Sequence, residues 1–152
     1  MSVYMVRHAK AGSRRNWSGK DSQRPLSKPG QRQAREIATM LADAGITRIV
    51  SSPYVRCVQT VEPLASVCGV TVDVSDALAE GAPLVDAAAL LDKLAREQSV
   101  LCSHGDVIGD LLMHLVDQGV RIGDFRLEKG SVWVLDTADG RVTGARYLAP
   151  PS

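Results

Sequence analysis

The chain has 152 residues, of which 45% are hydrophobic and 23% are charged, and its formal net charge is +1. These values are typical of a soluble globular protein, and we expect a single domain over residues 1–152 with a buried core. No apolar stretch is long enough to cross a bilayer, and the N-terminus lacks the basic and apolar regions of a secretory signal. We therefore expect a cytoplasmic protein with no membrane partner.

The net charge hides an asymmetry along the chain. Residues 1–35 carry nine Lys or Arg and one acid, Asp21, whereas the remainder carries nine Lys or Arg and sixteen acids. A basic segment raises the local concentration of an anionic partner. The segment lacks the series of stacking aromatics of a nucleic-acid binder, so a compact phosphorylated substrate fits better than nucleic acid.

Cysteine and histidine spacing indicates neither a disulfide framework nor a metal site. Three widely spaced cysteines lie in apolar surroundings and indicate reduced core residues. None is followed by an arginine six positions later, so the spacing of the cysteine phosphatases is absent. His8, His104 and His114 show no close pairing of the metal-binding kind. We expect no metal and no cofactor.

The first third of the chain predicts a strand, a loop and a helix. Val3 to Val6 is a short apolar run that predicts a buried strand, and Arg7 and His8 follow it directly. Residues 12–28 are polar and predict a loop. Ser27 is a plausible N-cap of a helix that ends near Ala44, because Gly45 stops the apolar periodicity.

Strands and helices continue to alternate along the rest of the chain. The pattern predicts strands over 46–51, 70–74 and 99–103, an irregular segment over 76–84, and a final hairpin of strands 131–136 and 141–147. Helices are expected over 55–67, over 87–97 with Asp86 as the cap, and over 107–116.

This order predicts an α/β fold of three layers, α/β/α, with a mainly parallel sheet and an antiparallel edge strand. Three of the expected strands end in polar residues: Arg7-His8, Ser51-Ser52 and Ser103-His104. The carboxyl ends of parallel strands meet at one edge, where ligands bind in open α/β sheets. We therefore expect these residues to converge, with Arg56 one turn after the second strand.

Two histidines and two arginines at one edge make a site for a phosphate dianion. One imidazole can attack phosphorus while the other donates hydrogen bonds, and Arg7 and Arg56 offset the charge. His104 precedes a glycine that opens a helix, so helix N–H groups can also face the anion. A solvated polar loop is the alternative interpretation for each motif taken alone.

The motifs resemble those of the histidine phosphatase (phosphoglycerate mutase-like) superfamily, in the same order and over nearly the whole chain. They are Arg7-His8-Ala9, where many members have glycine in the third place, and the stretches over 26–34, 51–60 and 103–105. The resemblance implies a phosphoglycerate mutase-like fold, a phosphorylated nucleophile at His8, and a phosphate pocket of Arg7, Arg56 and His104. The small size looks most like the SixA-type phosphohistidine phosphatases, and also like the phosphatase domain attached to some bacterial MutT-type Nudix hydrolases.

The resemblance also implies an acid between the two histidine motifs, and Glu80 lies where it is expected. A carboxyl group there can protonate an ester leaving group. A solvated loop carboxylate is the alternative for Glu80. Asp76 and Asp106 are poorer candidates, and we expect Asp106 to cap its helix.

Basic residues of the first loop are candidates for binding the substrate beyond its phosphate. For each one taken singly, a solvated surface charge is the alternative. These candidates are Lys10, Arg14, Arg15, Lys20 and Arg24. His114 is expected to be a partly buried structural histidine.

The sequence thus predicts a metal-independent phosphatase that works through a phosphohistidine at His8. Its expected partner is a phosphorylated small molecule or a phosphoprotein, that is, a phosphomonoester or a phosphohistidine. A nucleotide-type phosphatase is an alternative, and a non-catalytic module that binds phospho-ligands is another. A mutase is disfavoured, because the chain lacks room for the insertions that enclose a bisphosphate in larger members of the superfamily.

Overall fold

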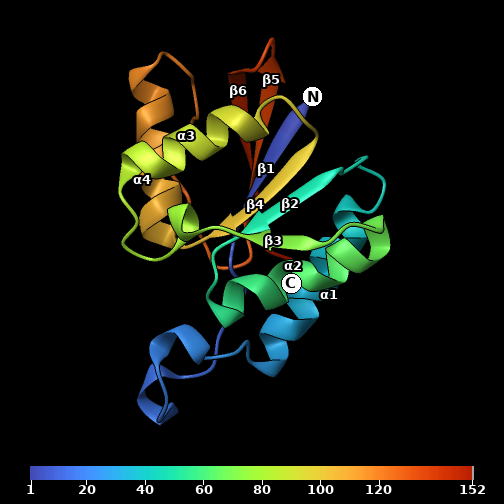
Figure 1. The fold of residues 1–152 in the computed structure, drawn as a ribbon, viewed down its shortest axis with the longest axis vertical. Coiled ribbons are helices and arrows are strands. Elements are labelled where there is room, and N and C mark those ends of the chain that lie inside the picture. The colour runs from blue at the N-terminus through green and yellow to red at the C-terminus, as the bar shows by residue number, and fades with distance from the viewer. Residues whose placement is uncertain (152) are drawn as a thin grey trace.

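A six-stranded sheet with the order β3-β2-β4-β1-β5-β6 runs through residues 1–151, which the computed structural model describes (Figure 1). The strands β1, β2, β3 and β4 pair in parallel, while β5 is antiparallel to both β1 and β6. Their bounds are β1 Ser2–Arg7, β2 Arg48–Ser51, β3 Val72–Val74, β4 Ser99–Ser103, β5 Val132–Ala138 and β6 Arg141–Leu148. The predicted mainly parallel sheet with an antiparallel edge is confirmed.

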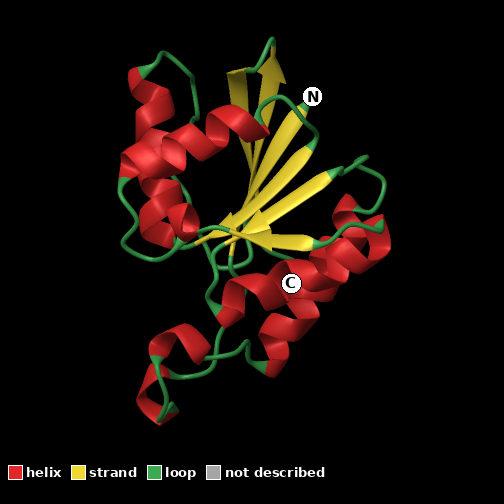
Figure 2. Ribbon diagram, in the orientation of Figure 1, coloured by secondary structure: helices red, strands yellow, loops and turns green. Residues whose placement is uncertain are grey.

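Helices cover both faces of this sheet (Figure 2). They are α1 Lys28–Leu41 and α2 Val55–Cys68 on one face, and α3 Leu84–Leu94 and α4 Gly105–Asp117 on the other. Because side chains alternate along a strand, neighbours in β1 serve different cores. Met5 packs with α3 and α4, and Val6 packs with α1 and α2. The three-layer α/β/α architecture is therefore confirmed.

Helix α1 begins as its sequence predicts. The Ser27 hydroxyl accepts a hydrogen bond from the Gly30 N–H at 3.2 Å, which is the bond of an N-cap. Gly30 also allows α1 to lie directly on the first loop, since a Cβ at this position would sit 1.8 Å from the Lys10 carbonyl oxygen. Gly45 has a φ of +71° and follows the turn after the helix.

Two helix starts differ from the sequence prediction. Helix α3 begins at Leu84 with Pro83 at the N-cap, so Asp86 lies in the first turn instead of capping a later helix. A carboxylate is favourable there, because the first turn carries unpaired N–H groups. Helix α4 begins at Gly105, two residues earlier than expected, with His104 at the N-cap. Within residues 1–151, no helix is long and apolar enough to span a lipid bilayer.

Three parallel strands bring their carboxyl ends to one edge of the sheet. Strands β2, β4 and β1 are neighbours in that order. Arg7 pairs in register with Ser103, and Ser51 pairs with Cys102. The segment 12–27, which contains two short 3-10 turns, extends from this edge in the lower part of Figure 1. The residues that follow the three strands consequently meet beside this segment.

Candidate active site

A cavity of about 600 Å³ lies at this edge of the sheet. Its walls come from the ends of β1 and β4, the first turns of α2 and α4, the segment 12–27, the loop before α3 and the loop before β5. The lining residues are Arg7, His8, Arg14, Arg24, Arg56, Glu80, His104, Gly105, Asp106, Leu127 and Lys129. The structure thus brings together the two histidines, the two arginines and the acid that the sequence singles out.

His8 is buried and has a defined tautomer. Its Nδ1 lies 2.8 Å from the carbonyl oxygen of Ala9, and because that oxygen only accepts hydrogen bonds, Nδ1 carries the hydrogen. Burial away from water, together with the neighbouring Arg56, His104 and Arg7, lowers the pKa of His8 from its ordinary 6.5 to about 3. At neutral pH the imidazole is therefore uncharged, and Nε2 holds a free electron pair, as a nucleophile requires.

His104 is fixed from the opposite side. Its Nε2 lies 2.9 Å from the Ser52 hydroxyl and 3.6 Å from the Cys57 sulfur. The Tyr54 ring meets the His104 ring edge to face at 4.6 Å between centroids. Its Nδ1 lies 4.0 Å from a carboxylate oxygen of Glu80. These contacts hold the Nε2 edge of the ring in the protein and leave the Nδ1 edge toward the cavity.

Arg7 lies against the beginning of α4. Its Nη1 donates to the carbonyl oxygen of Leu127. A Cβ on Gly105 would sit 3.0 Å from the Arg7 guanidinium carbon, so a glycine at this position lets the guanidinium approach the helix end. The N-terminus of a helix carries a partial positive charge. Arg7 and α4 therefore add their positive potentials at the same place.

Arg56 reaches the cavity from the first turn of α2 and is 1% exposed. Its guanidinium lies 4.9 Å from the centroid of the Tyr54 ring, which favours a cation over its face. The backbone of Arg56 is tied to β1 through Thr60, whose hydroxyl donates to the Arg56 carbonyl at 2.7 Å and accepts from the Ala9 N–H at 2.9 Å. The residues that follow β1 and the first turn of α2 are thereby held together.

Three buried side-chain nitrogens at this site have no hydrogen-bond partner among residues 1–151, and all three are donors when His104 Nε2 accepts from the Ser52 hydroxyl. They are Arg7 Nε, Arg56 Nε and His104 Nδ1. Buried polar nitrogens are normally paired, because an unpaired one loses the hydrogen bonds that water would have given it. Three such donors from residues that line one cavity are suited to an anion with several oxygens, such as a phosphate.

Glu80 reaches the cavity from the loop before α3. One of its oxygens lies 3.7 Å from Arg56 Nη2, and its side chain is 42% exposed. Asp106 instead directs both carboxylate oxygens to backbone groups, since it accepts from the Gly81 N–H and the Val107 N–H, each at 2.8 Å. Asp106 does not cap α4 as predicted. It ties the Glu80 loop to the first turn of that helix.

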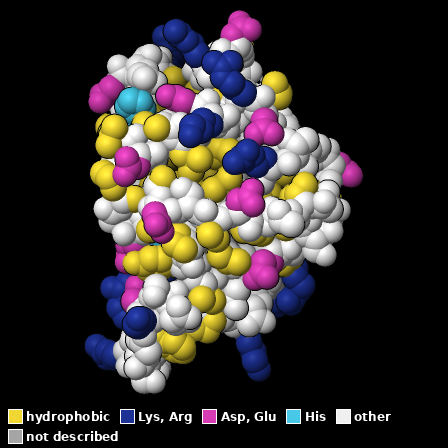
Figure 3. Space-filling view, viewed as in Figure 1, with side chains coloured by type: hydrophobic (Ala, Val, Ile, Leu, Met, Phe, Trp, Pro, Cys, Tyr) yellow, Lys and Arg dark blue, Asp and Glu magenta, His cyan; other side chains and the backbone are white. Residues whose placement is uncertain are grey.

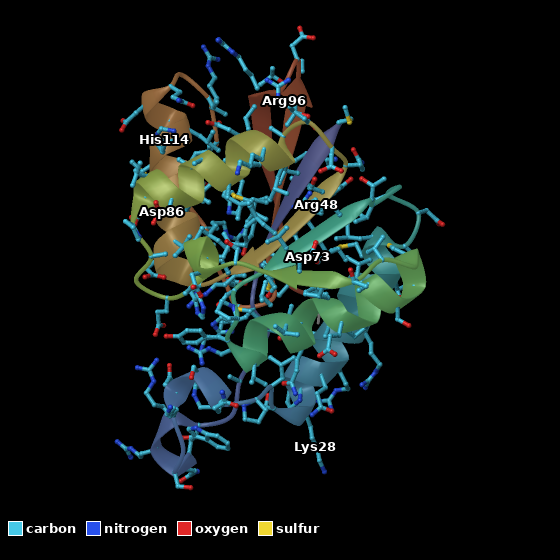
Figure 4. The ribbon with its side chains drawn as sticks, viewed as in Figure 1. Lys28, Arg48, Asp73, Asp86, Arg96 and His114 are labelled. Atoms are coloured by element: carbon cyan, nitrogen blue, oxygen red, sulfur yellow. The ribbon has the colours of Figure 1, made fainter. Side chains whose placement is uncertain are left out.

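The predicted basic residues of the first loop divide into two groups. Arg14 and Arg24 line the cavity. Lys10 borders a different pocket beside Gln33, and Arg15 and Lys20 are exposed on the surface without lining the cavity. Lys and Arg side chains are visible around the lower end of the molecule in Figure 3. His114 lies well along α4, away from the strand ends (Figure 4).

Two charged residues of the site were missed by the sequence analysis. Lys129 lines the cavity, and partial burial together with the nearby cations Arg7, Arg24, Arg56 and Arg14 lowers its pKa. Asp21 accepts hydrogen bonds from Arg56 and Arg24. The only sequence signal for Asp21 was its isolation as a single acid among nine basic residues.

Comparisons with known proteins give matches to a protein family, to a curated relative and to solved structures. Residues 3–83 match the Histidine phosphatase superfamily (branch 1), a range that includes Arg7, His8, Arg56 and Glu80. The chain is 37% identical, over an alignment of 156 residues, to the 8-oxo-(d)GTP phosphatase of Mycolicibacterium smegmatis. That match covers 99% of this chain and 48% of the relative, so the chain spans about half the length of the curated protein.

Solved structures share the fold across the whole chain. The protein histidine phosphatase SixA, complexed with tungstate, has a TM-score of 0.75 at 23% identity, covering 98% of this chain and 95% of that one. A mycobacterial glucosyl-3-phosphoglycerate phosphatase complexed with VO3 has a TM-score of 0.76 at 18% identity, covering 99% of both chains. At these identities the likeness shows a common fold.

Proposed function

The chain belongs to the histidine phosphatase superfamily, as its motifs predict, and from this premise we propose that it is a phosphatase with His8 as its nucleophile. The observation that carries the proposal is the state of His8. Its pKa of about 3 and its bond from Nδ1 to the Ala9 carbonyl leave an uncharged Nε2 at the cavity. The cations Arg7 and Arg56 line the same cavity and suit a phosphoryl group.

In the proposed first step, His8 Nε2 attacks phosphorus. A bond forms between nitrogen and phosphorus, the bond to the leaving group breaks, and the leaving group takes a proton. Arg7, Arg56, His104 Nδ1 and the N-terminus of α4 stabilise the charge on the phosphoryl oxygens. Glu80 is the proposed proton donor, because it lies 4.0 Å from His104 and 3.7 Å from Arg56 within the same cavity.

In the proposed second step, water attacks the phosphohistidine. The bond between phosphorus and His8 breaks, inorganic phosphate leaves, and Glu80 takes a proton from the water. Glu80 gives one proton to the leaving group in the first step and regains one from water in the second. The enzyme therefore returns to its starting state. The positive groups that this mechanism requires are side chains of the cavity and the N-terminus of α4, and we propose that it runs without a metal.

The test is turnover of p-nitrophenyl phosphate in the presence of a chelator, combined with trapping of the intermediate. A phosphoramidate is stable in base and labile in acid, unlike a serine ester. We expect turnover to persist in chelator, and we expect the acid-labile label to be lost in His8→Ala. Labelling that survives in His8→Ala, or activity restored only by added divalent ions, would contradict the proposal.

The substrate class is open to two proposals that belong to the same site. A phosphohistidine or simple phosphomonoester needs only the groups that bind its phosphoryl group. A nucleotide-type substrate is favoured by Arg14 and Lys129, two further cations that line the cavity, and by the relative named an 8-oxo-(d)GTP phosphatase. Comparing kcat/KM for phosphohistidine, alkyl phosphates and nucleotides separates the two. Binding of all of them without turnover would instead indicate a non-catalytic module.

A further inference from the structure

Asp21 lies where three arginines meet. Its Oδ2 accepts from Arg56 Nη2 at 3.0 Å, and its Oδ1 accepts from Arg24 Nε at 3.1 Å. Arg14 Nε lies 3.7 Å from the same Oδ1. The backbone carbonyl of Asp21 accepts a further bond from Arg56 Nη1 at 2.8 Å. Both terminal nitrogens of Arg56 are therefore bonded to one residue.

We propose that Asp21 is a positioning residue that fixes the guanidinium of Arg56 for phosphate binding. This inference rests on the proposed function, in which Arg56 binds the phosphoryl group. An arginine side chain has many rotamers, and two bonds to its terminal nitrogens fix the plane of the guanidinium. The Nε–H of Arg56 is buried and without a partner among residues 1–151, and each terminal nitrogen has a second N–H beside the one bonded to Asp21. Asp21 thus sets the direction in which Arg56 presents the N–H donors that Asp21 does not bind.

Charge explains why an acid is needed at this place. The side chains of Arg24 and Arg56 are 8% and 1% exposed, and both bind the same carboxylate. Two buried cations so close together repel each other strongly, because water screens them poorly. Burial alone would raise the pKa of Asp21, but the hydrogen bonds from Arg56 and Arg24 lower it. Asp21 consequently stays ionised and offsets part of this repulsion.

The segment that carries Asp21 is itself tied to the rest of the protein. Within the segment, Arg24 Nη1 donates to the Gly12 carbonyl at 2.6 Å. The Leu26 N–H donates to the Gln59 side chain, outside the segment, at 2.9 Å. Gln59 belongs to α2, the same helix that carries Arg56. Asp21 therefore contacts Arg56 from a segment that is braced by its own bond and tied to α2, which is what a positioning role requires.

An alternative role for Asp21 predicts the opposite effect of its removal on oxyanion binding. If its carboxylate competed with the phosphate for Arg56, its removal would strengthen oxyanion binding. If it positions Arg56, its removal weakens oxyanion binding even though the site becomes more positive. Asparagine is the informative substitution, because it keeps the shape but has one oxygen and one donor group. In either orientation of this amide, its NH2 group faces the guanidinium of Arg56 or of Arg24, so two donors meet and one hydrogen bond is lost.

The experiment measures the affinity for orthovanadate by calorimetry, and kcat and KM for p-nitrophenyl phosphate, in the wild type and in Asp21→Asn. Small misplacements of binding groups cost up to ~100-fold, so we expect weaker vanadate binding and a loss in kcat/KM of about 10- to 100-fold. Asp21→Glu keeps the carboxylate and should recover part of the loss. Ser22→Ala, in the same 3-10 turn, is the matched control and should behave as the wild type.

A double-mutant cycle with Arg56→Met tests whether Asp21 acts through Arg56. In that background we expect Asp21→Asn to cost little further vanadate affinity. Tighter vanadate binding in Asp21→Asn, or an equal cost in both backgrounds, would overturn the inference. A wild type that binds vanadate but does not turn over p-nitrophenyl phosphate would count against the proposed function, while the effect of Asp21→Asn on vanadate affinity would still decide the positioning role.

Discussion

The rings of His8 and His104 meet edge to face with 5.5 Å between their centroids. They come from the ends of two paired parallel strands, and they are held at different nitrogens, His8 at Nδ1 and His104 at Nε2. The arrangement leaves His8 Nε2 and His104 Nδ1 for the ligand. One ring is thus suited to attack and the other to donate a hydrogen bond.

This division of roles predicts different outcomes for the two alanine variants. His8→Ala should abolish both turnover and the covalent label, since no other nitrogen replaces Nε2. His104→Ala should slow turnover by ~10²–10³-fold, the usual effect of removing one donor to the transition state, and should leave the label on residue 8. Mass spectrometry of base-quenched protein locates the label. A label found at residue 104 in the wild type would reverse the assignment.

Replacement of either pocket arginine by lysine should be costly. Arg7→Lys and Arg56→Lys keep the charge but lose the planar fork and its Nε donor. We expect kcat/KM for p-nitrophenyl phosphate to fall by ~10²-fold in each variant. Arg48→Lys is the control, because Arg48 is exposed and pairs only at 3.7 Å with Glu97. Near wild-type activity in Arg56→Lys would show that charge alone suffices.

The strand ends explain why much of this site was predictable. Arg7, His8 and His104 follow apolar runs directly, and a parallel sheet places the ends of such runs at one edge. Arg56 lies in the first turn of the helix that follows β2, so the end of that strand places it at the same edge. Asp21 lies in a short 3-10 turn and Lys129 in a loop, neither with an apolar periodicity, so only tertiary contacts bring Asp21 to Arg56 and Lys129 to the cavity. The predicted Asp86 cap was wrong because Pro83, which has no N–H to lose, begins α3 earlier.

The low pKa of His8 predicts a pH dependence of stability. Its pKa is about 3 in the folded chain against 6.5 ordinarily, so between these values the unfolded chain binds more protons and stability rises with pH. As pH falls from 7 to 4, His8 should remove up to ~1.4 kcal/mol per pH unit from the free energy of unfolding. Urea unfolding of the wild type and His8→Gln measures the difference. Parallel pH curves for the two proteins would contradict the assigned state of His8.

Gly30 should tolerate no side chain. A Cβ at Gly30 would sit 1.8 Å from the Lys10 carbonyl oxygen, which also accepts bonds from the Ser27 N–H and hydroxyl at 3.0 and 3.1 Å. Gly30→Ala should therefore lower the free energy of unfolding by about 1–3 kcal/mol or more, as overpacking does. Gly12→Ala is the matched control in the same region, because a Cβ at Gly12 would meet nothing within 4 Å. Equal stability of the two variants in urea would contradict the close approach of α1.

Glu80 allows the two substrate classes to be separated by leaving group. An alkyl ester leaves as an alkoxide, which needs a proton in the transition state, and general acid help of this kind is typically worth ~10²–10⁴-fold. A phosphohistidine leaves as an imidazole, and p-nitrophenyl phosphate leaves as a stabilised phenolate. Glu80→Gln should therefore slow alkyl phosphates by that order and scarcely change the other two substrates.

The measurement is kcat/KM of Glu80→Gln on all three substrates, with Glu97→Gln as a surface control because Glu97 pairs only with exposed Arg48. Equal loss on every substrate would assign Glu80 to binding, since it also lies 3.7 Å from Arg56 Nη2. No loss of kcat/KM on any of the three substrates would show that Glu80 takes no part in the reaction. A wild type that is fast on phosphohistidine and slow on alkyl esters would favour the phosphohistidine class, because an imidazole departs readily without a proton donor and an alkoxide does not.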